Sequence, residues 1–409
     1  MRATTMIRRM LGMSKTVVEE IDLKGQALIV TVRPQWQKPR CGSCGTMAPQ
    51  YERKRKPRRW RHLGMGSMKV FVEYRLRRVS CPSCQGVKTE RVPWARPGSD
   101  FTRDFEELTG FLAQSTDKTT VKALMGISWR TVGSIVDRLL LDYRDPEKLR
   151  DLKRIGVDEF SYRRRHRYVT VIVDQDTGEV VWVEKGHGAK ALKRFFRVLG
   201  KEGRKKIELV SIDMAAGYKK AVRDHLRNAQ IVFDRFHVQR VVGNALDEMR
   251  RELLREKRGT PEGKRLFKSR FALLRRWFRT REEEEEKLEE IRTSNQKLYR
   301  GYMIYQDFAD VLDIPDPAEA QKALKRWMAW AARSRLRPFV KAGQTIRKHL
   351  DGILLYFRSG RMTNARVEGI NNRIRVIARR AYGFHSAEAL ISMIFLCCGG
   401  ITLNPPLPA

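Results

Sequence analysis

The chain has 409 residues, with 84 Lys and Arg against 47 Asp and Glu, so its formal net charge at pH 7 is +37. This length provides for roughly two to four domains of about 100–200 residues each and excludes a small disulfide-stapled fold. So large a positive excess predicts a polyanionic partner, nucleic acid rather than an anionic membrane, because each neutralised phosphate releases counterions.

Targeting and membrane signals are weak in this sequence. The longest apolar stretch, residues 389–398, falls short of the ~18 residues that cross a bilayer and is typical of a buried helix. Residues 1–10 lack the apolar region of a signal peptide, so we expect a cytosolic protein. Six cysteines in such a chain indicate metal ligands or core residues rather than disulfides.

Residues 1–100 are predicted to form a zinc-ribbon module. Alternating apolar residues favour strands at 27–32 and 69–77, and a C-x-x-C pair follows each strand. Four thiolates on two tight turns suit a tetrahedral structural Zn²⁺, whereas a redox pair or unligated thiols are the alternatives. His62 is a possible substitute ligand. The proposed zinc ligands are Cys41, Cys44, Cys81 and Cys84.

A basic run fills the gap between the two cysteine pairs. We interpret it as a loop that follows DNA phosphates, and a merely solvated basic face is an equal alternative. Its basic residues are Arg53, Lys54, Arg55, Lys56, Arg58, Arg59 and Arg61.

Residues 101–148 are predicted to form a helix-turn-helix. Gly126 ends a first helix, Ser128 caps a second, and apolar residues including Val121, Leu124 and Ile135 would pack the two helices together. With this net charge we favour DNA recognition over an ordinary helical hairpin. The residues expected to face DNA are Ser128, Trp129, Arg130, Thr131 and Ser134.

Beyond residue 148 strands and helices alternate. Residues 149–237 carry five strand candidates, at 155–162, 167–174, 180–185, 207–213 and 229–234. A hairpin turn at 174–178 makes the second and third strands antiparallel, and helices at 189–199 and 218–227 would cross over to parallel fourth and fifth strands. This order predicts a mixed sheet of the ribonuclease H kind in a multidomain α+β protein.

Residues 238–360 read as a large all-helical insertion. Leu288, Ile291, Leu298, Tyr302 and Tyr305 follow a spacing typical of packed helices. Stacking on an unpaired base is conceivable for three tryptophans of this region, but core packing is the stronger interpretation. These tryptophans are Trp277, Trp327 and Trp330.

The last part, residues 361–409, returns to the core with a helix that carries Glu368. Val367, Ile370 and Ile374 make its apolar stripe. Asparagines and an arginine surround the single acid on the neighbouring face, which is an unusual choice unless that face meets a cation. Besides Glu368, this face presents Asn364, Asn371, Asn372 and Arg375.

Three acids on core elements point to phosphodiester chemistry. The first and fourth strands are expected to be neighbours, which sets Asp158 beside Asp213, and Glu368 would join them. Close carboxylates repel unless a divalent cation neutralises them, and hard oxygen ligands select Mg²⁺ or Mn²⁺. Two such ions can activate an attacking oxygen and stabilise a leaving one.

The neighbouring acids have weaker claims. Strand alternation points Glu159 to the face opposite Asp158. Asp174 lies in the predicted hairpin turn. Asp234 and His237 end the fifth strand, where a catalytic role and a purely structural pair are equally good interpretations.

These residues resemble the motifs of DDE transposases of bacterial insertion sequences, and the order of parts is similar to the ISL-three family. The motifs are Asp158 in VDEF, Asp213 in SIDMAAGY, Asp234 and His237 in DRFH, and Glu368 in NARVEGINNR. The resemblance implies a ribonuclease H-like core split by the insertion, with Asp158, Asp213 and Glu368 as a metal-binding triad supported by Asp234 and His237.

The resemblance also implies what the protein does. We expect a DNA transposase that binds terminal inverted repeats, cleaves DNA with Mg²⁺ and joins the freed ends to target DNA, as a homodimer on paired ends in the bacterial cytoplasm. A zinc-dependent DNA-binding regulator with a non-cleaving core is the alternative from another class. A structure-specific nuclease of the same fold is a second alternative.

Overall fold

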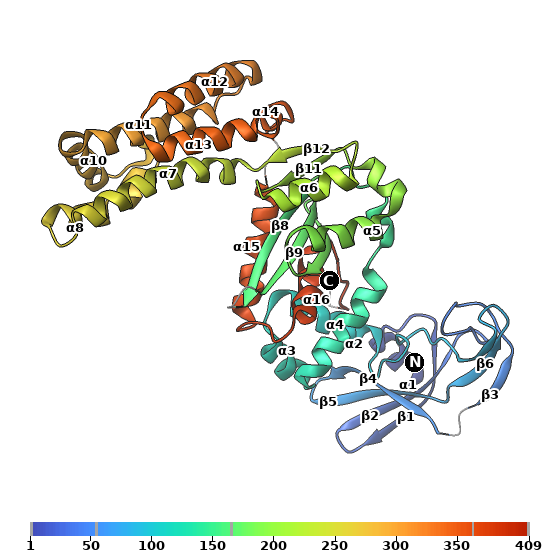
Figure 1. Ribbon diagram of the computed structural model, residues 1–409. Helices are drawn as coiled ribbons and strands as arrows, with labels where there is room; N and C mark the ends of the chain where they lie inside the picture. Colours follow the sequence, from blue (N-terminus) through green and yellow to red (C-terminus); the bar gives the residue numbers. More distant parts are fainter. Residues whose placement is uncertain (1–2, 54–55, 164–166, 362–363, 407–409) are drawn as a thin grey trace. The chain divides into compact units, whose positions relative to one another are not determined.

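The computed structural model describes residues 3–53, 56–163, 167–361 and 364–406, with nothing stated of the side chain of Arg53. The chain forms two compact units (Figure 1). The first comprises Met1–Arg144 together with Ile377–Ala409, and the second is Asp145–Val376. The division falls within helix α15 (Ala365–Arg380), so the described residues from Ile377 onward belong to the first unit, whereas 361–409 is predicted as one part of the core.

The first unit contains a four-stranded sheet with the strand order β1-β2-β5-β4. Its strands are β1 (Thr16–Lys24), β2 (Ala27–Pro34), β5 (Met68–Tyr74) and β4 (Arg58–Met65), and helix α1 (Ala3–Leu11) lies against β1. Val30, Val70 and Val72 are fully buried in its core. The interpretation of residues 53–61 as one loop is therefore wrong for Arg58, Arg59 and Arg61, which lie in β4 and pair across to β5. Lys54 and Arg55 lie outside the described residues.

A second, three-stranded antiparallel sheet carries the cysteine turns. It consists of β3 (Gln50–Arg53), β6 (Arg77–Cys81) and β7 (Gly86–Thr89). The strand predicted at 69–77 ends at Tyr74, because Arg77 already pairs with Arg53 in this other sheet.

The predicted helix-turn-helix is confirmed. Its helices are α3 (Lys118–Met125) and α4 (Trp129–Tyr143), preceded by α2 (Arg103–Ser115). Gly126 ends α3 with φ 58°, a left-handed conformation that glycine adopts without strain, and the Ser128 hydroxyl accepts the Thr131 N–H at the start of α4. Leu124 is 65% exposed, so its predicted packing role is wrong, and Met125 is buried instead.

The C-terminal helix α16 (Ala387–Cys398) completes the first unit by packing on α4 and α2. Gly110 of α2 permits the close approach of Leu139 on α4 and of Leu403, which follows α16. A Cβ at this position would collide with Leu139 Cδ1 and would lie 2.9 Å from Leu403 Cδ1. The apolar run 389–398 is thus covered by α2 and α4.

The second unit is built on a five-stranded mixed sheet with the order β10-β9-β8-β11-β12. The strands are β8 (Arg154–Arg163), β9 (Arg167–Asp174), β10 (Val180–Lys185), β11 (Leu209–Ile212) and β12 (Gln230–Phe233). The first three are antiparallel neighbours and the last two run parallel to β8, as predicted. Helices α5 (Gly188–Lys206) and α6 (Ala216–His225) make the crossovers.

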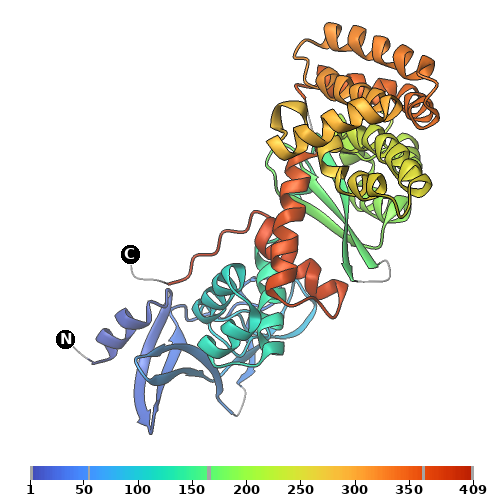
Figure 2. The ribbon, with the colours of Figure 1, turned by 90° about the vertical axis from the view of Figure 1, so that its left-hand side faces the viewer.

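Helix α15 lies beside the strands of this sheet (Figure 2). Gly156 on β8 makes the close approach possible, because a Cβ at this position would collide with Val367 Cγ2 and Gln175 Nε2. The side-chain amide of Asn364 also donates to the Val157 carbonyl oxygen at 3.4 Å.

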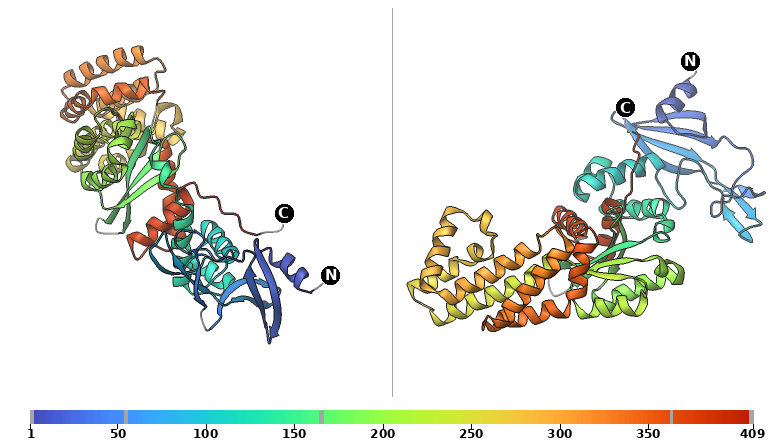
Figure 3. Two further views of the ribbon diagram at one scale, coloured as in Figure 1. Left: turned by 90° about the vertical axis from the view of Figure 1, so that its right-hand side faces the viewer. Right: turned by 90° about the horizontal axis from the view of Figure 1, so that it is seen from above.

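Between β12 and α15 the chain is helical, and its helices pack side by side (Figure 3). The apolar positions predicted to pack, Leu288 to Tyr305, are buried. Trp327 is a core residue that donates its indole N–H to the Ile304 carbonyl oxygen, whereas Trp277 is 59% exposed. The longer helices are α7 (Arg235–Glu256), α8 (Pro261–Lys268), α10 (Glu282–Ser294), α11 (Gln296–Val311), α12 (Pro317–Arg333), α13 (Arg337–Lys348) and α14 (Leu350–Arg358).

Throughout the described ranges, no helix is both long enough and apolar enough to span a membrane.

Candidate functional site

Three aspartates continue one row across the core sheet. Ser211 of β11 pairs with Gly156 of β8, and the same register extended by two residues would set Asp213, just beyond the end of β11, opposite Asp158. Ile212 pairs with Phe233 of β12, so the next residue, Asp234, continues this row. Neighbouring strands lie about 4.8 Å apart, and residues of one row in parallel strands point to the same face. The carboxylates of Asp158, Asp213 and Asp234 therefore lie near one another where β11 and β12 end, a place that we call the sheet edge.

Asp158 is half-buried at the end of this row. Burial raises the pKa of Asp158, and the charges of Asp213 and Asp234 act in the same direction, while the Glu159 N–H and His237 oppose them. Its Oδ2 accepts a 2.7 Å hydrogen bond from Asn371 Nδ2 on α15. A carboxylate that resists ionisation beside other carboxylates is suited to a cation.

Asp213 directly follows β11 and begins the turn into α6. Its Oδ1 accepts the Ala215 N–H at 2.9 Å, which holds the side chain where the strand ends. The residue is half-buried and has a second carboxylate oxygen for a ligand.

Asp234 and His237 form an ion pair at the start of α7. His237 Nδ1 lies 3.0 Å from Asp234 Oδ2, and the backbone N–H of Asn364 donates to Asp234 Oδ1 at 3.1 Å. Burial alone would raise the pKa of Asp234, but the hydrogen bonds from His237 and Asn364 outweigh it and lower the pKa. The bond with Asp234 raises the pKa of His237 despite partial burial. Asp234 thus joins the sheet edge to α7 and to the segment that begins α15.

Glu368 is exposed on α15, one turn after Asn364 and nearly one turn before Asn371. Because both asparagines contact the sheet edge, the 3.6-residue period places Glu368 on the same side of the helix. The carboxylates of Asp158, Asp213 and Glu368 do not all lie within 4.8 Å of one another, since the cysteines below are the group of three or more acidic, His or Cys residues in the described chain that meets this distance.

Glu159 faces away from this edge, as predicted. Its Oε1 accepts hydrogen bonds from the Gly188 N–H at the start of α5 and from the Tyr218 hydroxyl at 2.6 Å. The adjacent acids Asp158 and Glu159 therefore serve opposite faces of β8, and Glu159 has a structural explanation of its own.

The four predicted zinc ligands are gathered in the ribbon. The sulfur atoms of Cys41, Cys44, Cys81 and Cys84 all lie within 4.8 Å of one another. Cys41 Sγ lies 3.9 Å from Cys84 Sγ, and Cys44 Sγ lies 3.5 Å from Cys81 Sγ. Tetrahedral zinc with Zn–S bonds of about 2.3 Å requires sulfur separations of about 3.8 Å. The donor set therefore fits structural zinc, and His62 is excluded as a ligand because it is buried and hydrogen-bonded to Thr102.

Of the residues predicted to face DNA at the start of α4, Ser128, Trp129, Arg130 and Ser134 are exposed and Thr131 is half-buried. The basic strand β4 has internal partners. Arg58 pairs with Asp100 and Arg59 with Glu73. Arg61 donates to the Gly126 carbonyl oxygen in the turn of the helix-turn-helix, at 2.7 Å, so it connects the sheet to that motif.

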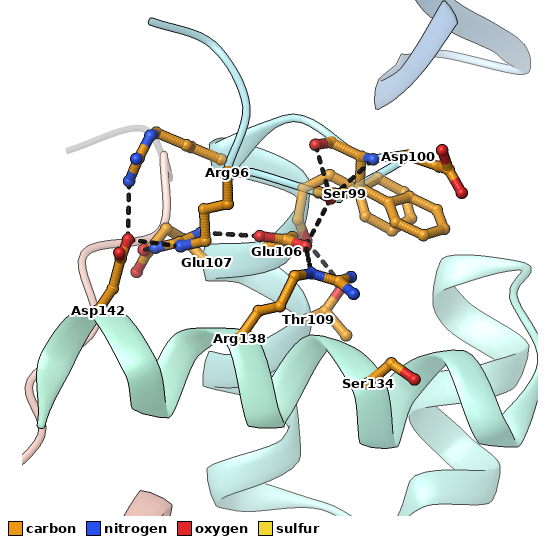
Figure 4. Close-up of polar contacts among 12 residues, drawn as sticks. Arg96, Ser99, Asp100, Glu106, Glu107, Thr109, Ser134, Arg138 and Asp142 are labelled. Carbon is orange, nitrogen blue, oxygen red and sulfur yellow. Dashed lines mark hydrogen bonds and ion pairs between the residues drawn. The ribbon is translucent and has the colours of Figure 1, made fainter. Parts of the chain in front are cut away.

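A buried ion network that sequence reasoning missed joins α4 of the helix-turn-helix to α2 (Figure 4). Arg96, whose side chain is 3% exposed, donates to Glu106 and Glu107 of α2 and to Asp142 of α4. Arg138 of α4 donates to the other oxygen of Glu106 at 2.7 Å. Charges so deeply buried must be paired, so the network sets the position of α4 against α2.

A chain that carries a four-cysteine ribbon, a helix-turn-helix and an α/β core with an acidic edge has the parts of a transposase, and comparison with known proteins agrees. Residues 155–394 match a transposase family model, residues 37–84 match the zinc finger of the transposases IS204/IS1001/IS1096/IS1165, and residues 90–140 match the helix-turn-helix domain of transposase family ISL3. The chain belongs to the ISL3 family of transposases.

Two similar proteins are described as transposases of insertion sequence elements. The transposase for insertion sequence element IS1557 of Mycobacterium tuberculosis is 35% identical over 439 residues, covering 100% of this chain and 98% of the relative. The transposase for insertion sequence element IS1001 of Bordetella parapertussis is 29% identical over 367 residues, covering 89% of this chain and 90% of the relative.

Proposed function

We propose that this transposase binds the terminal inverted repeats of an insertion sequence, cleaves DNA at them and joins the freed ends to target DNA, with Asp158, Asp213 and Glu368 as its catalytic triad. One observation carries the proposal: Asn371, less than one turn from Glu368, is hydrogen-bonded to Asp158, the residue that Asp213 would face if the register of β8 and β11 is extended. In this proposal the sheet is a ribonuclease H-like core split by the helical insertion 238–360.

The residues at the sheet edge fit hard divalent cations. The proposed metal ligands Asp158, Asp213 and Glu368 offer only oxygen atoms, the ligand type that Mg²⁺ and Mn²⁺ prefer. Among the described residues, Asn371 Oδ1 and Asn364 Oδ1 are buried without a hydrogen-bond partner. Asp158, Asp213 and Glu368 would hold two Mg²⁺, which when bound supply activation of the attacking oxygen and neutralisation of the leaving one.

The protein's own groups prepare this site. Asn371 orients the Asp158 carboxylate, and Asp213 is held by the Ala215 N–H. Glu368 is exposed, and in this proposal its side chain turns toward the aspartates when metal binds. The hydrogen bond with Asp234 raises the pKa of His237, and the protonated ring would place a positive charge beside Asp158, where it would attract a DNA phosphate.

DNA is bound by the first unit in this proposal. The ribbon supplies a zinc-stabilised surface, and the N-terminal end of α4 enters the major groove. Cutting two ends in concert calls for a homodimer on paired repeats, acting on DNA in the bacterial cytoplasm.

The test separates binding from cleavage. Asp158→Asn, Asp213→Asn and Glu368→Gln keep size and hydrogen bonding but remove a metal ligand. We expect each to abolish Mg²⁺-dependent cleavage of a duplex carrying the repeats while its affinity for that duplex stays at the wild-type value. Asp176→Asn is the matched control, since this acid lies in the exposed hairpin turn and pairs with Arg154.

Each alternative gives a different result in this test. Cleavage retained in any triad variant refutes the assigned site. Repeat binding by the wild type without metal-dependent nicking indicates a DNA-binding regulator. Cutting of branched DNA without end joining indicates a structure-specific nuclease.

A further inference from the structure

We infer that the loop 381–385, which follows α15, is a second DNA-contacting element beside the recognition helix α4, with Tyr382 as its contact residue. The inference rests on the proposed binding of repeat DNA and adds a contact outside both the ribbon and the helix-turn-helix. All of the residues concerned belong to the first unit.

Tyr382 occupies a backbone position that suits glycine. The Gly383 N–H donates to the Ala378 carbonyl oxygen at 2.9 Å and the Tyr382 N–H to that of Arg379 at 3.0 Å, the paired bonds of a Schellman ending. Tyr382 has φ 51°, within the left-handed region that is unfavourable for side chains with a Cβ. A tyrosine here costs folding free energy that glycine would not.

Packing does not explain the tyrosine either. Its side chain is 98% exposed, whereas Phe384, two residues further, is buried. The loop is therefore anchored through Phe384 and presents Tyr382 to solvent. A residue that is unfavourable for the backbone and contributes nothing to the core is accounted for by a ligand.

The loop is fixed to the helix-turn-helix by specific contacts. Arg380 donates to the carbonyl oxygens of Gln114 and Ala113 at the end of α2, each at 3.0 Å. The His385 ring meets the Trp129 ring edge-on, with centroids 6.4 Å apart. A pocket of about 40 Å³ is lined by both Trp129 and Tyr382. Tyr382 thus shares one surface with the N-terminal residue of the recognition helix.

The charge of this surface suits a DNA backbone. Lys118 Nζ lies 4.7 Å from the Trp129 ring centroid. Arg130, next to Trp129 in the sequence, and Arg379, three residues before Tyr382, are both exposed. Asp117 also lines the pocket, but its carboxylate accepts the N–H groups of Thr119 and Thr120 at the start of α3. A phenol among cations can donate to a phosphate and pack its ring on a deoxyribose, so the ligand that fits is duplex DNA flanking the groove read by α4.

The experiment uses the full-length protein and two duplexes, one with the terminal repeat of its insertion sequence and one of unrelated sequence. Tyr382→Gly removes the ring and relieves the left-handed strain. We expect affinity for the repeat duplex to fall about tenfold, with a melting temperature equal to or above the wild-type value. Leu141→Ala, which truncates a side chain 83% exposed toward the other end of α4, is the control and should leave both quantities unchanged.

The outcomes are distinct. If the wild type binds the repeat duplex and Tyr382→Gly binds it equally well, the inference is overturned and the proposed function stands. If the wild type shows no preference for the repeat duplex, the proposed function itself fails. If Tyr382→Gly loses self-association in sedimentation but keeps its DNA affinity, the loop contacts a second copy of the chain, which also overturns the inference.

Discussion

Asn371 Nδ2 lies 2.7 Å from Asp158 Oδ2, although 213 residues separate them in the chain. This hydrogen bond joins the last core helix to the first core strand. It also explains why the α15 motif is rich in asparagine, since an amide can satisfy a carboxylate through nitrogen while its oxygen is available to a cation.

Replacement of Asn371 by Ala should therefore weaken cleavage without affecting DNA binding. Loss of a partner that orients a metal ligand typically costs 10–100-fold in metal affinity or activity, so we expect a drop of about that size, partly restored at high Mg²⁺. Titration of Mg²⁺ in a cleavage assay measures it. Asn372→Ala is the control, because Asn372 is exposed and pairs with Arg375. Equal losses in both variants would contradict the assignment.

Gly156→Ala should move α15 away from β8. The added methyl group would collide with Val367 and Gln175, and overpacking of this kind typically costs about 1–3 kcal/mol. We expect lower stability in urea denaturation together with lower cleavage activity. Gly369→Ala, on the same helix but with no atom within 4 Å of the added Cβ, should instead stabilise by about 0.5–1 kcal/mol. A harmless Gly156→Ala would show that α15 does not depend on this contact.

The Asp234–His237 pair predicts a pH dependence of stability. The pKa of His237 is raised, so its contribution is complete below the unfolded value of about 6.5 and is lost as the pH rises through the folded pKa. The pKa of Asp234 is lowered, so its contribution is lost only in acid, as the pH falls through the folded pKa. The free energy of unfolding should decline as the pH rises above about 6.5, and less steeply in His237→Gln.

Urea denaturation at a series of pH values measures this decline. His187→Gln, which alters an exposed histidine of the same unit, should keep the wild-type slope. A slope in His237→Gln as steep as that of the wild type would assign the pH dependence to other groups.

Breaking the buried network should destabilise the first unit. Arg96→Met leaves Glu107 without its arginine and Glu106 with Arg138 alone, and loss of one partner of a buried ion pair typically costs about 3–5 kcal/mol. Urea denaturation of the variant measures the loss. Lys205→Met, which breaks a pair with the exposed Glu202, should have little effect on stability, because solvent screens exposed ion pairs. Similar costs for the two variants would mean that burial does not decide the strength of the network.

Zinc should be bound once per chain and required for the ribbon. We expect about one zinc per chain by elemental analysis, and Cys44→Ser should lose it together with repeat binding, because three thiolates hold the metal less tightly than four. Cys397→Ser, outside the cluster, should retain both. Full zinc content in Cys44→Ser would point to a different ligand set.

Much of the fold follows from local sequence signals. The five core strands and their order are predicted because apolar alternation, a hairpin turn and right-handed crossovers act over a few residues. The cysteine pairs and the caps at Gly126 and Ser128 are equally local. The wrong prediction of a basic loop arises because the partners of its charged residues are distant in the sequence. The charges of Arg58 and Arg59 suggest a loop, yet cross-strand partners such as Glu73 stabilise them in β4.

The sequence by itself determined the class of the protein, its zinc ligands and its candidate acids, because these depend on residue types at short, regular spacing. Only the tertiary structure decided that Asp234 extends the row of Asp158 and Asp213, that Asn371 reaches Asp158, and that Tyr382 stands beside the recognition helix. Such contacts join residues far apart in the chain. They depend on which helix face packs where, and that choice is settled by the free energy of the whole core rather than by any local pattern.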